Sequence, residues 1–392
     1  MLNKNMSPLR PLDSSQIVFL VTERSELKKS INNISQILEE ASIYSQILYL
    51  FSQYDLGTVS EVYEIFGGYV NKSYGVLTIK NKREYWYFVR MYKRGIIESE
   101  LHLEHSLIDF SITHGLDIAA GLIRTNNFKT FVKIDGRYFS IYDFLPGEDK
   151  YTWDSPLLND KEYASAAGVL ATFHNSARNF DPNGRERLEP KIMELLPMLP
   201  VAFKDYAERN IRSKFQAYFE HNLDNIIKII KDIQIPEKDL KKMIVNPIHS
   251  DFHPGNLKFM NDAVVGVFDF DWCKIDLRLF DVCLALVYSC CSWENDNDGV
   301  LLLDKCKIFL EAYQDKLNQL KGLPPLNKTE VKHLVNMIAA ANIYLINWTV
   351  NAYYTGSDLN VYEYLAYLQH NIRLMWWIEN HKEKISEMVK TI

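Results

Sequence analysis

The stretch that constrains this chain most lies in its second half. An apolar run ends at His249, and Asp251 and Asn256 follow with the spacing His-x-Asp-x-x-x-x-Asn. Turn residues at 261–262 then precede a second apolar run that leads to Asp269. Short apolar runs bounded by turn residues are typical of buried strands. The pattern therefore predicts two strands whose flanking loops carry polar side chains.

These side chains are the ones that phosphoryl transfer requires. The reaction needs a carboxylate that takes the proton of the acceptor hydroxyl, and oxygen ligands that hold Mg²⁺ across the phosphates of a nucleotide. Asp251 fits the first role, and Asn256 and Asp269 fit the second. A lone His-x-Asp is common by chance, and a buried His bonded to the backbone would also explain it. The complete ordered set predicts a kinase-type active site.

The same residues resemble the motifs of the aminoglycoside phosphotransferase and choline kinase superfamily, whose members phosphorylate small molecules. The family's His-Gly-Asp-x-His-x-x-Asn corresponds to residues 249–256, and its Ile-Asp-Phe element to residues 268–271. Ser250 replaces the usual Gly, where the loop often uses the backbone freedom of glycine. The resemblance implies that Asp281, before an apolar helix, anchors the loop as a structural residue. Asp271 is a further candidate acid.

The resemblance implies an α+β, protein-kinase-like bilobal fold with a small antiparallel-sheet N-lobe containing one helix, and a larger, mainly helical C-lobe. A chain of 392 residues exceeds what one small core usually serves, so two lobes are the default. We expect residues 1–56 to form a helical leader packed on the small lobe, with a partner surface as the alternative. Residues 57–146 are then the nucleotide-binding N-lobe, and residues 147–392 the C-lobe with the catalytic loop, metal and acceptor site.

Nucleotide contacts are expected mainly in the N-lobe. Strand-like runs on both sides of a glycine turn at 67–68 would let backbone amides approach phosphates, although any hairpin with Gly at its turn looks similar. Arg90 stands where the family has a phosphate-binding Lys, and Glu104 would orient it, with Glu100 as the other candidate. The alternative is that both glutamates are helix carboxylates exposed to solvent. The resemblance makes 143–145 the hinge whose backbone meets adenine. The expected nucleotide-binding residues are Gly67, Gly68, Asn71, Ser73, Arg90, Glu104, Asp143, Phe144 and Leu145.

The chain after residue 150 is predicted to be mostly helical. His174 lies in a helix that resembles the family's Leu-Ala-x-Leu-His helix, and we expect a structural role for it. The spacing predicts two helices at about 204–219 and 223–233, and an apolar core helix over 334–350. Aromatic residues of the last helix, from about 360 to 388, would line either the core or an acceptor pocket, and their helical spacing favours the core.

Charge and cysteine content exclude several classes of protein. The net charge is −6, so the chain has no overall basic field for nucleic acid or an anionic membrane. The five cysteines lie in one half and lack Cys-x-x-Cys pairs, which indicates reduced, mostly buried thiols. No signal peptide and no apolar run long enough to span a bilayer is visible. We therefore expect a cytoplasmic protein without a nucleic-acid or membrane partner.

These features predict an ATP- and Mg²⁺-dependent kinase that phosphorylates a hydroxyl of a small molecule. Short stretches at 53–57, 67–71 and 89–92 look most similar to homoserine-kinase type II-like members, which implies an amino alcohol such as homoserine, or a related amine or sugar, as the acceptor. The alternatives are an aminoglycoside-type antibiotic phosphotransferase and a non-catalytic kinase-like protein that holds nucleotide without turnover. The acceptor, the choice of ATP or GTP, and the oligomeric state stay open.

Overall fold

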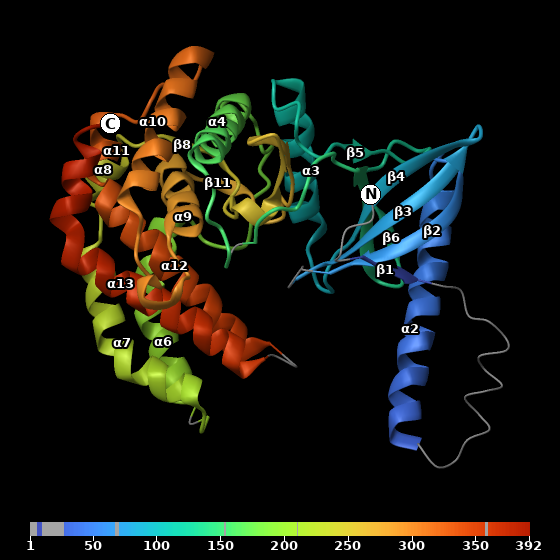
Figure 1. Cartoon of the computed structure of the whole chain (residues 1–392), viewed down its shortest axis with the longest axis horizontal. Helices are drawn as coiled ribbons and strands as arrows, with labels where there is room; N and C mark the ends of the chain where they lie inside the picture. The colour runs from blue at the N-terminus through green and yellow to red at the C-terminus, as the bar shows by residue number, and fades with distance from the viewer. Residues whose placement is uncertain (1–5, 10–26, 67–69, 153, 210, 357–359) are drawn as a thin grey trace. The chain divides into compact units, whose positions relative to one another are not determined.

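The computed structural model describes residues 6–9, 27–66, 70–152, 154–209, 211–356 and 360–392. The chain divides into two units. The first runs to Glu98 and includes Ala120–Leu145, and the second consists of Ser99–Ala119 and Pro146–Ile392. An antiparallel sheet forms most of the first unit and helices most of the second (Figure 1). The division into leader, N-lobe and C-lobe stays a prediction.

The first unit is built on a sheet with the order β1-β2-β3-β4-β7-β5, and β6 pairs with β7 off this path. All pairs in it are antiparallel. The edge strand β1 contains a proline, which edge positions tolerate, and the sequence did not predict it. The strands are β1 (Met6–Leu9), β2 (Thr58–Ile65), β3 (Lys72–Lys80), β4 (Arg83–Met91), β5 (Leu122–Ile123), β6 (Val132–Ile134) and β7 (Arg137–Asp143).

Two-residue turns join β3 to β4 and β6 to β7. Asn81 and Lys82 have φ angles of 53° and 63°, and Asp135 and Gly136 have φ angles of 48° and 77°. Positive φ at both central residues is the turn geometry that matches the twist of paired strands. Local turn chemistry thus fixes the register of both hairpins.

Helix α2 (Leu27–Ser52) packs against this sheet. Its buried residues Ile43, Ile47 and Leu50 recur at helical spacing and share one apolar cluster with Tyr74 and Val89 of the sheet. Complete burial of a large apolar side chain contributes about 1.5–3 kcal/mol. Apolar contact with the sheet therefore holds α2 in place.

The second unit is mainly helical, and its short strands form two antiparallel pairs. β8 (Val245–Ile248) pairs with β11 (Lys274–Leu277), and β9 (Leu257–Met260) pairs with β10 (Ala263–Val267). α9 packs on α12, and α12 on α13. The α-helices are α3 (Glu98–Thr113), α4 (Asp160–Ala177), α5 (Ile192–Leu195), α6 (Leu199–Ala207), α7 (Lys214–Asp232), α8 (Glu237–Leu240), α9 (Arg278–Cys290), α10 (Leu303–Leu320), α11 (Lys328–Lys332), α12 (Leu334–Thr355) and α13 (Val361–Val389).

One predicted helix boundary is wrong. The sequence predicted helices over 204–219 and 223–233, but α7 runs unbroken through the predicted gap. It begins after Ser213, whose side chain accepts the backbone N–H of Gln216 at 3.0 Å. Serine is a strong N-cap residue, so the break lies between α6 and Ser213 instead.

The aromatic residues of α13 belong largely to the core. Tyr364, Tyr367 and His370 are buried, which confirms the predicted core role, whereas Trp376 is 40% exposed. The core role predicted for the apolar helix α12 is confirmed too, because most of its first half is buried.

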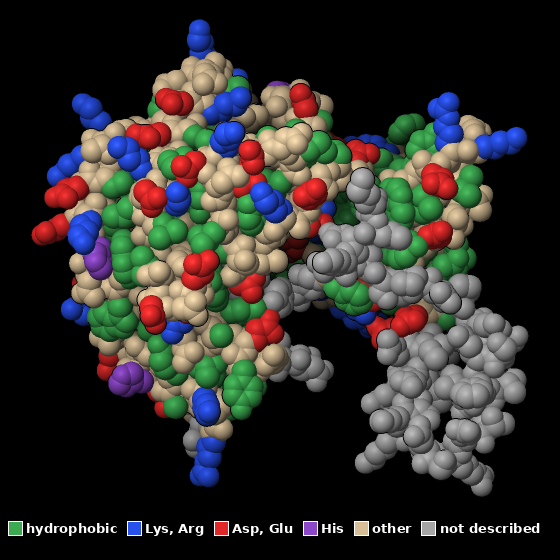
Figure 2. Space-filling model, in the orientation of Figure 1, with side chains coloured by type: hydrophobic (Ala, Val, Ile, Leu, Met, Phe, Trp, Pro, Cys, Tyr) green, Lys and Arg blue, Asp and Glu red, His purple; other side chains and the backbone are tan. Residues whose placement is uncertain are grey.

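Three properties of the surface and interior bear on function. On the face shown in Figure 2, acidic and basic side chains of the larger unit are interspersed. The described helices include none that combines the length and the apolar character needed to cross a bilayer. All five cysteines are buried free thiols, which confirms the prediction made from their spacing.

Candidate active site

Asp281, in the first turn of α9, anchors the loop that follows β8. Its carboxylate accepts the backbone N–H groups of His249 and Ser250, both at 2.8 Å, and His174 donates to it from Nε2 at 3.0 Å. Burial raises the pKa of Asp281, but the hydrogen bonds outweigh burial and hold that pKa below its usual value. The predicted structural roles of Asp281 and His174 are confirmed.

Ser250 adopts the backbone conformation that explains why the family pattern has glycine at this position. Its φ angle is 62°, in the left-handed region that costs a residue with a side chain about 1–2 kcal/mol. Asp269 has a φ angle of 67°. Such strained residues persist only where surrounding contacts hold them, as Asp281 holds the N–H of Ser250.

Asp251 carries a carboxylate that is held but not enclosed. Tyr288 donates its hydroxyl to Oδ1 at 3.1 Å, and Asn256 donates from Nδ2 to Oδ2 at 3.1 Å. The same amide of Asn256 also donates to the main-chain oxygen of Asp251 at 2.9 Å. The Asp251 side chain is 21% exposed. Its oxygens therefore keep acceptor capacity on the side that faces solvent.

His253 lies beside this carboxylate with a defined tautomer. Its Nδ1 accepts the backbone N–H of Gly255 at 3.1 Å, so a neutral ring carries its proton on Nε2. Nε2 lies 3.7 Å from Oδ2 of Asp251. A Cβ atom at Gly255 would lie 2.9 Å from the His253 ring, so this close approach requires glycine.

Asp269 follows β10 next to a residue that contacts the Asp251 loop. The N–H of Phe268 donates to the main-chain oxygen of Asn256 at 3.2 Å, and His249 donates from Nε2 to the oxygen of Phe268 at 3.1 Å. Burial lowers the pKa of His249, and the charges of Asp281, Asp251 and Asp269 act against that shift. These contacts place the backbone before Asp269 beside the loop, and a joint role of Asp251, Asn256 and Asp269 stays a prediction.

Asp271 is buried two residues further on. Its main-chain oxygen accepts a hydrogen bond from Arg187, whose guanidinium lies 4.6 Å from the centre of the Trp272 ring. These contacts concern the backbone of Asp271 and leave the chemical role of its carboxylate a prediction.

Two of the nucleotide-binding residues predicted in the first unit, Ser73 and Arg90, lie on the neighbouring strands β3 and β4. Gly67 and Gly68 lie outside the described residues. Asn71 accepts the N–H of Lys93 through Oδ1 at 2.9 Å. Ser73 is the β3 partner of Arg90 on β4, and Arg90 is only 4% exposed. The phosphate contacts of these residues stay predictions.

The two candidate glutamates of α3 have different surroundings. Glu100 accepts the backbone N–H of Leu188 at 3.0 Å and lies near the surface. Glu104 is 2% exposed, so the alternative that it is a solvated helix carboxylate is wrong. Glutamate is rarely buried without a partner, which favours Glu104 over Glu100 for a specific role. The pairing of Glu104 with Arg90 stays a prediction.

The predicted hinge residues end the first unit. Asp143 is the last residue of β7, and its N–H donates to the oxygen of Gly121 at 2.8 Å. Burial raises the pKa of Asp143. The Phe144 ring lies 5.6 Å from that of Trp86, and Leu145 is the last residue of the unit. Adenine recognition by this backbone stays a prediction.

Sequence reasoning missed Tyr288, which contacts Asp251 directly. A signal for it exists in the spacing. Tyr288 follows Asp281 by seven residues, which is two helical turns, and therefore lies on the same face of α9. Without knowledge of what that face contacts, an aromatic residue in an apolar helix is read as core.

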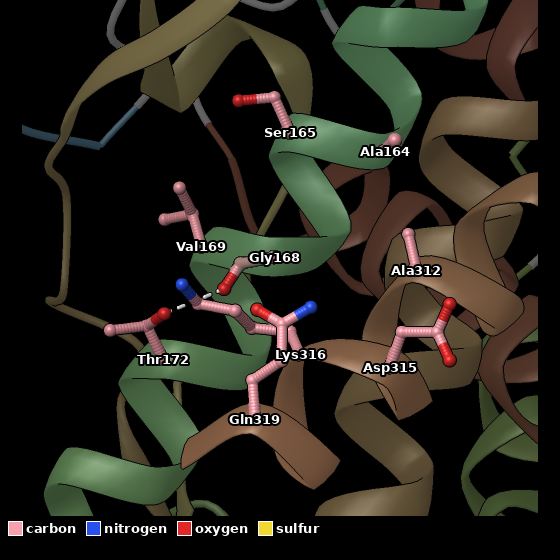
Figure 3. Close-up of a pocket in the computed structure, with 9 residues that line it drawn as sticks. All are labelled: Ala164, Ser165, Gly168, Val169, Thr172, Ala312, Asp315, Lys316 and Gln319. Carbon is pink, nitrogen blue, oxygen red and sulfur yellow. Dashed lines mark hydrogen bonds between the residues drawn. The ribbon is translucent and has the colours of Figure 1, made fainter.

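A pocket of 460 Å³ lies elsewhere on the second unit, between α4 and α10 (Figure 3). None of its lining residues belongs to the predicted site. On the α4 side of the pocket, Thr172 donates its hydroxyl to the backbone oxygen of Gly168, one turn earlier on the same helix. The residues that line it are Ala164, Ser165, Gly168, Val169, Thr172, Ala312, Asp315, Lys316 and Gln319.

The donor set near Asp251 suits a metal that is carried by a nucleotide. Within the described residues, no three His, Cys, Asp or Glu side chains are grouped so that they would hold a metal ion alone. Asn256 and Asp269 offer an amide oxygen and a carboxylate. Mg²⁺ usually takes one or two protein carboxylates and completes its shell with water and substrate phosphates. The residues present therefore fit Mg²⁺.

A strand-rich unit, a helical unit and a His-x-Asp loop define the protein-kinase-like class, and solved structures confirm this fold. The chain is similar to a spectinomycin phosphotransferase, with a TM-score of 0.60, 17% identity, and coverage of 86% of this chain and 98% of that one. It is also similar to a microcompartment-associated aminopropanol kinase, with a TM-score of 0.61, 14% identity, and coverage of 88% and 98%.

The model of the phosphotransferase enzyme family matches residues 67–315, and the chain belongs to that family. Among curated relatives, the homoserine kinase of Zymomonas mobilis is 24% identical over 259 residues, which span 66% of this chain and 73% of that protein. The chain is therefore a small-molecule kinase, a phosphotransferase with an alcohol group as acceptor. The resemblance to homoserine-kinase-like members is confirmed.

Proposed function

We propose that the chain transfers the γ-phosphate of ATP to the hydroxyl of a compact amino alcohol such as homoserine. The observation that carries the proposal is the partly exposed carboxylate of Asp251, held by Asn256, whose main-chain oxygen accepts the N–H of Phe268, the residue before Asp269. The similarity to several homoserine kinases supports this acceptor class. The fold shared with an aminopropanol kinase and an ethanolamine kinase supports it as well.

Asp251 is proposed as the group that accepts the proton of the acceptor hydroxyl. The hydroxyl oxygen then bonds to the γ-phosphorus while the bond from that phosphorus to the bridging oxygen of ADP breaks. The carboxylate suits the task because its two donors fix its orientation and leave acceptor capacity toward solvent. A positioned acid–base group of this kind contributes about 10²–10⁴-fold in rate.

Asn256 and Asp269 are proposed to hold Mg²⁺. Because the Asn256 nitrogen donates to Asp251, the amide oxygen points away from Asp251 and is the atom offered to a cation. When bound, Mg²⁺ neutralises the charge that develops on the β- and γ-phosphate oxygens. The solved structure of an amicoumacin kinase contains AMP-PNP and Ca²⁺, which supports a nucleotide with a divalent metal.

The remaining nucleotide contacts are proposed for the first unit and for α3. Arg90 would bind the α- and β-phosphates bidentately, with Glu104 as its orienting partner. Gly67, Gly68, Asn71 and Ser73 would approach the phosphates, and the backbone of 143–145 would contact adenine. The spectinomycin phosphotransferase structure contains ADP, which supports an adenine nucleotide.

Turnover of candidate acceptors tests this function. ATP consumption with Mg²⁺ is measured for homoserine, aminopropanol, ethanolamine, choline, sugars and aminoglycosides, with wild type and Asp251→Ala compared in parallel. We expect wild type to phosphorylate the amino alcohols and Asp251→Ala to lose about 10²–10⁴-fold in kcat. Equal turnover by both proteins would remove Asp251 from the chemistry.

An antibiotic acceptor is the second candidate. Spectinomycin and kanamycin occupy the solved structures of two neighbours, both under 25% identical, and that likeness concerns the fold. Turnover of an aminoglycoside with a higher kcat/KM than homoserine would establish this alternative. Magnesium-dependent nucleotide binding without turnover of any acceptor would contradict both proposals.

A cytoplasmic location is proposed from the thiols. The five cysteines are free and buried, as expected where glutathione and thioredoxin keep thiols reduced. A small-molecule acceptor needs no nucleic-acid or membrane partner. Fractionation of cells that express the chain tests the location, and recovery with the membrane fraction would contradict it.

A further inference from the structure

We infer that Tyr288 is a positioning residue that fixes the orientation of the Asp251 carboxylate. Its hydroxyl donates to Oδ1 of Asp251 at 3.1 Å, while Asn256 serves Oδ2. Only the expected effect on kcat rests on the proposed function. The geometry itself does not depend on which acceptor is phosphorylated.

Tyr288 is mounted on the same helix that anchors the backbone of the loop. Asp281, two turns earlier on α9, accepts the N–H groups of residues 249 and 250. At its start, α9 is fixed by the buried Arg278, which donates to Glu330 at 2.9 and 2.7 Å. One rigid face of α9 therefore sets both the loop backbone and the carboxylate that projects from it.

The tyrosine hydroxyl can act only as a donor toward Asp251. Burial raises the pKa of Tyr288 well above its usual value, and the charge of Asp251 raises it further. The phenol therefore stays protonated across the working range of the protein. The Tyr288 ring also faces the His253 ring at 5.1 Å, so the aromatic plane is held by a neighbour in the same loop.

Two donors on two oxygens prevent rotation of the carboxylate about its Cβ–Cγ bond. If Tyr288 is removed, Asn256 alone holds the group, and Asn256 is also the proposed metal ligand. A displacement of a reacting group by as little as about 1 Å lowers the rate of the reaction on the order of 10²-fold. The tyrosine thus keeps the reactive oxygen aimed without touching substrate.

Tyr344 of α12 provides a matched control. It is also a buried tyrosine with a raised pKa, caused first by burial and then by the charge of Glu189. Its hydroxyl donates to Glu189 at 3.0 Å and makes no described hydrogen bond to Asp251. Replacement by Phe removes the same atom from a similar environment in both variants.

The kinetic test compares Tyr288→Phe with Tyr344→Phe on the acceptor that wild type phosphorylates. We expect kcat of Tyr288→Phe to fall about 10–100-fold with the KM for ATP unchanged, because Tyr288 is not among the proposed nucleotide contacts. Tyr344→Phe should keep the wild-type kcat. A wild-type kcat in Tyr288→Phe, or an equal loss in both variants, would overturn the positioning role.

A spectroscopic test separates this inference from the proposed function, because it needs no turnover. With ¹³C-labelled Asp at one fixed neutral pH, the carboxyl signal of Asp251 is assigned through Asp251→Asn. We expect that signal to move in Tyr288→Phe and to stay in place in Tyr344→Phe. An unmoved signal in Tyr288→Phe refutes the inference even if the acceptor has been identified.

If Tyr288→Phe does not fold, a second measurement that leaves Tyr288 in place tests the same hydrogen bond. The phenolic ¹³Cζ signal of Tyr288 is then compared between wild type and Asp251→Asn, both labelled at Tyr. Loss of the charged acceptor should move this signal. Identical ¹³Cζ signals in the two proteins would refute the hydrogen bond and with it the positioning role.

Discussion

Two aspartates, Asp251 in the loop after β8 and Asp281 in the first turn of α9, have opposite surroundings. Asp281 is fully buried, and two backbone N–H groups and His174 occupy three of the roughly four acceptor positions of its carboxylate. Asp251 is 21% exposed, with one side-chain donor for each oxygen. Burial closes the carboxylate of Asp281 to a substrate, whereas the partly exposed carboxylate of Asp251 can still accept a proton from one. The difference distinguishes a structural anchor from the residue that is proposed to react.

The largest expected effect comes from removing the proposed base, Asp251. Asp251→Asn keeps the size of the side chain and removes the base, so we expect kcat to fall about 10²–10⁴-fold. The free energy of unfolding in urea should change little, because the position is partly exposed. Asp232→Asn, at the exposed end of α7, is the control for both measurements. A large loss of stability without loss of kcat would reverse the assignment of the two aspartates.

The next largest effect comes from removing the structural anchor, Asp281. Asp281→Ala leaves two backbone N–H groups and His174 buried without their acceptor, so the free energy of unfolding should fall by about 3–5 kcal/mol. Urea denaturation measures this change, and Asp232→Ala should lie within about 0.5 kcal/mol of wild type. If Asp281→Ala unfolded at the wild-type midpoint, the anchor account would be wrong.

The buried imidazole of His249 makes the free energy of unfolding depend on pH. Burial lowers the pKa of His249 below the usual 6.5. Below pH 6.5 the unfolded chain therefore binds a proton that the folded chain does not. Stability from this group is present above that pH and falls as the pH drops toward the folded-state pKa, by at most about 1.4 kcal/mol per pH unit.

Urea denaturation of His249→Gln over this pH range measures the contribution. We expect the free energy of unfolding of His249→Gln to depend less steeply on pH than that of wild type, because the glutamine amide does not titrate. His221→Gln, at an exposed position of α7, should keep the wild-type slope. Parallel slopes for His249→Gln and wild type would show that His249 is not held neutral.

The smallest expected effect comes from relaxing the backbone next to Asp251, at Ser250. Ser250→Gly removes the left-handed strain of about 1–2 kcal/mol but makes the unfolded chain more flexible, so the net gain in unfolding free energy is about 0.5–1 kcal/mol. Ser106→Gly in α3, where the backbone is helical, should instead lose about 0.5–1 kcal/mol. Destabilisation by Ser250→Gly would show that the serine side chain contributes more than its backbone conformation costs.

Local chemistry explains which elements were predictable from the sequence. The turn at residues 261–262, which joins β9 to β10, is encoded in its local residues, and the family resemblance implied the anchoring role of Asp281. The set of Asp251, Asn256 and Asp269 could be proposed from the sequence because the residues stand within one loop and just after the strand pair that follows it, and their joint role stays a prediction. Their placement needs few contacts from distant parts of the chain.

Tertiary packing explains what was missed. Tyr288 has the same local pattern as any aromatic residue of a core helix, and only the contact of α9 with the loop distinguishes it. The cap at Ser213 was overlooked because apolar spacing alone placed a helix across it. The edge strand β1 is short and gains its strand character from pairing with β2.

A crystal structure with Mg²⁺ and AMP-PNP bound tests the central claim most directly. We expect the metal to be coordinated by the Asn256 amide oxygen and the Asp269 carboxylate, with Oδ1 or Oδ2 of Asp251 facing the γ-phosphate. A metal-bound nucleotide held without Asn256 and Asp269, or with Asp251 turned away from the γ-phosphate, would contradict the account.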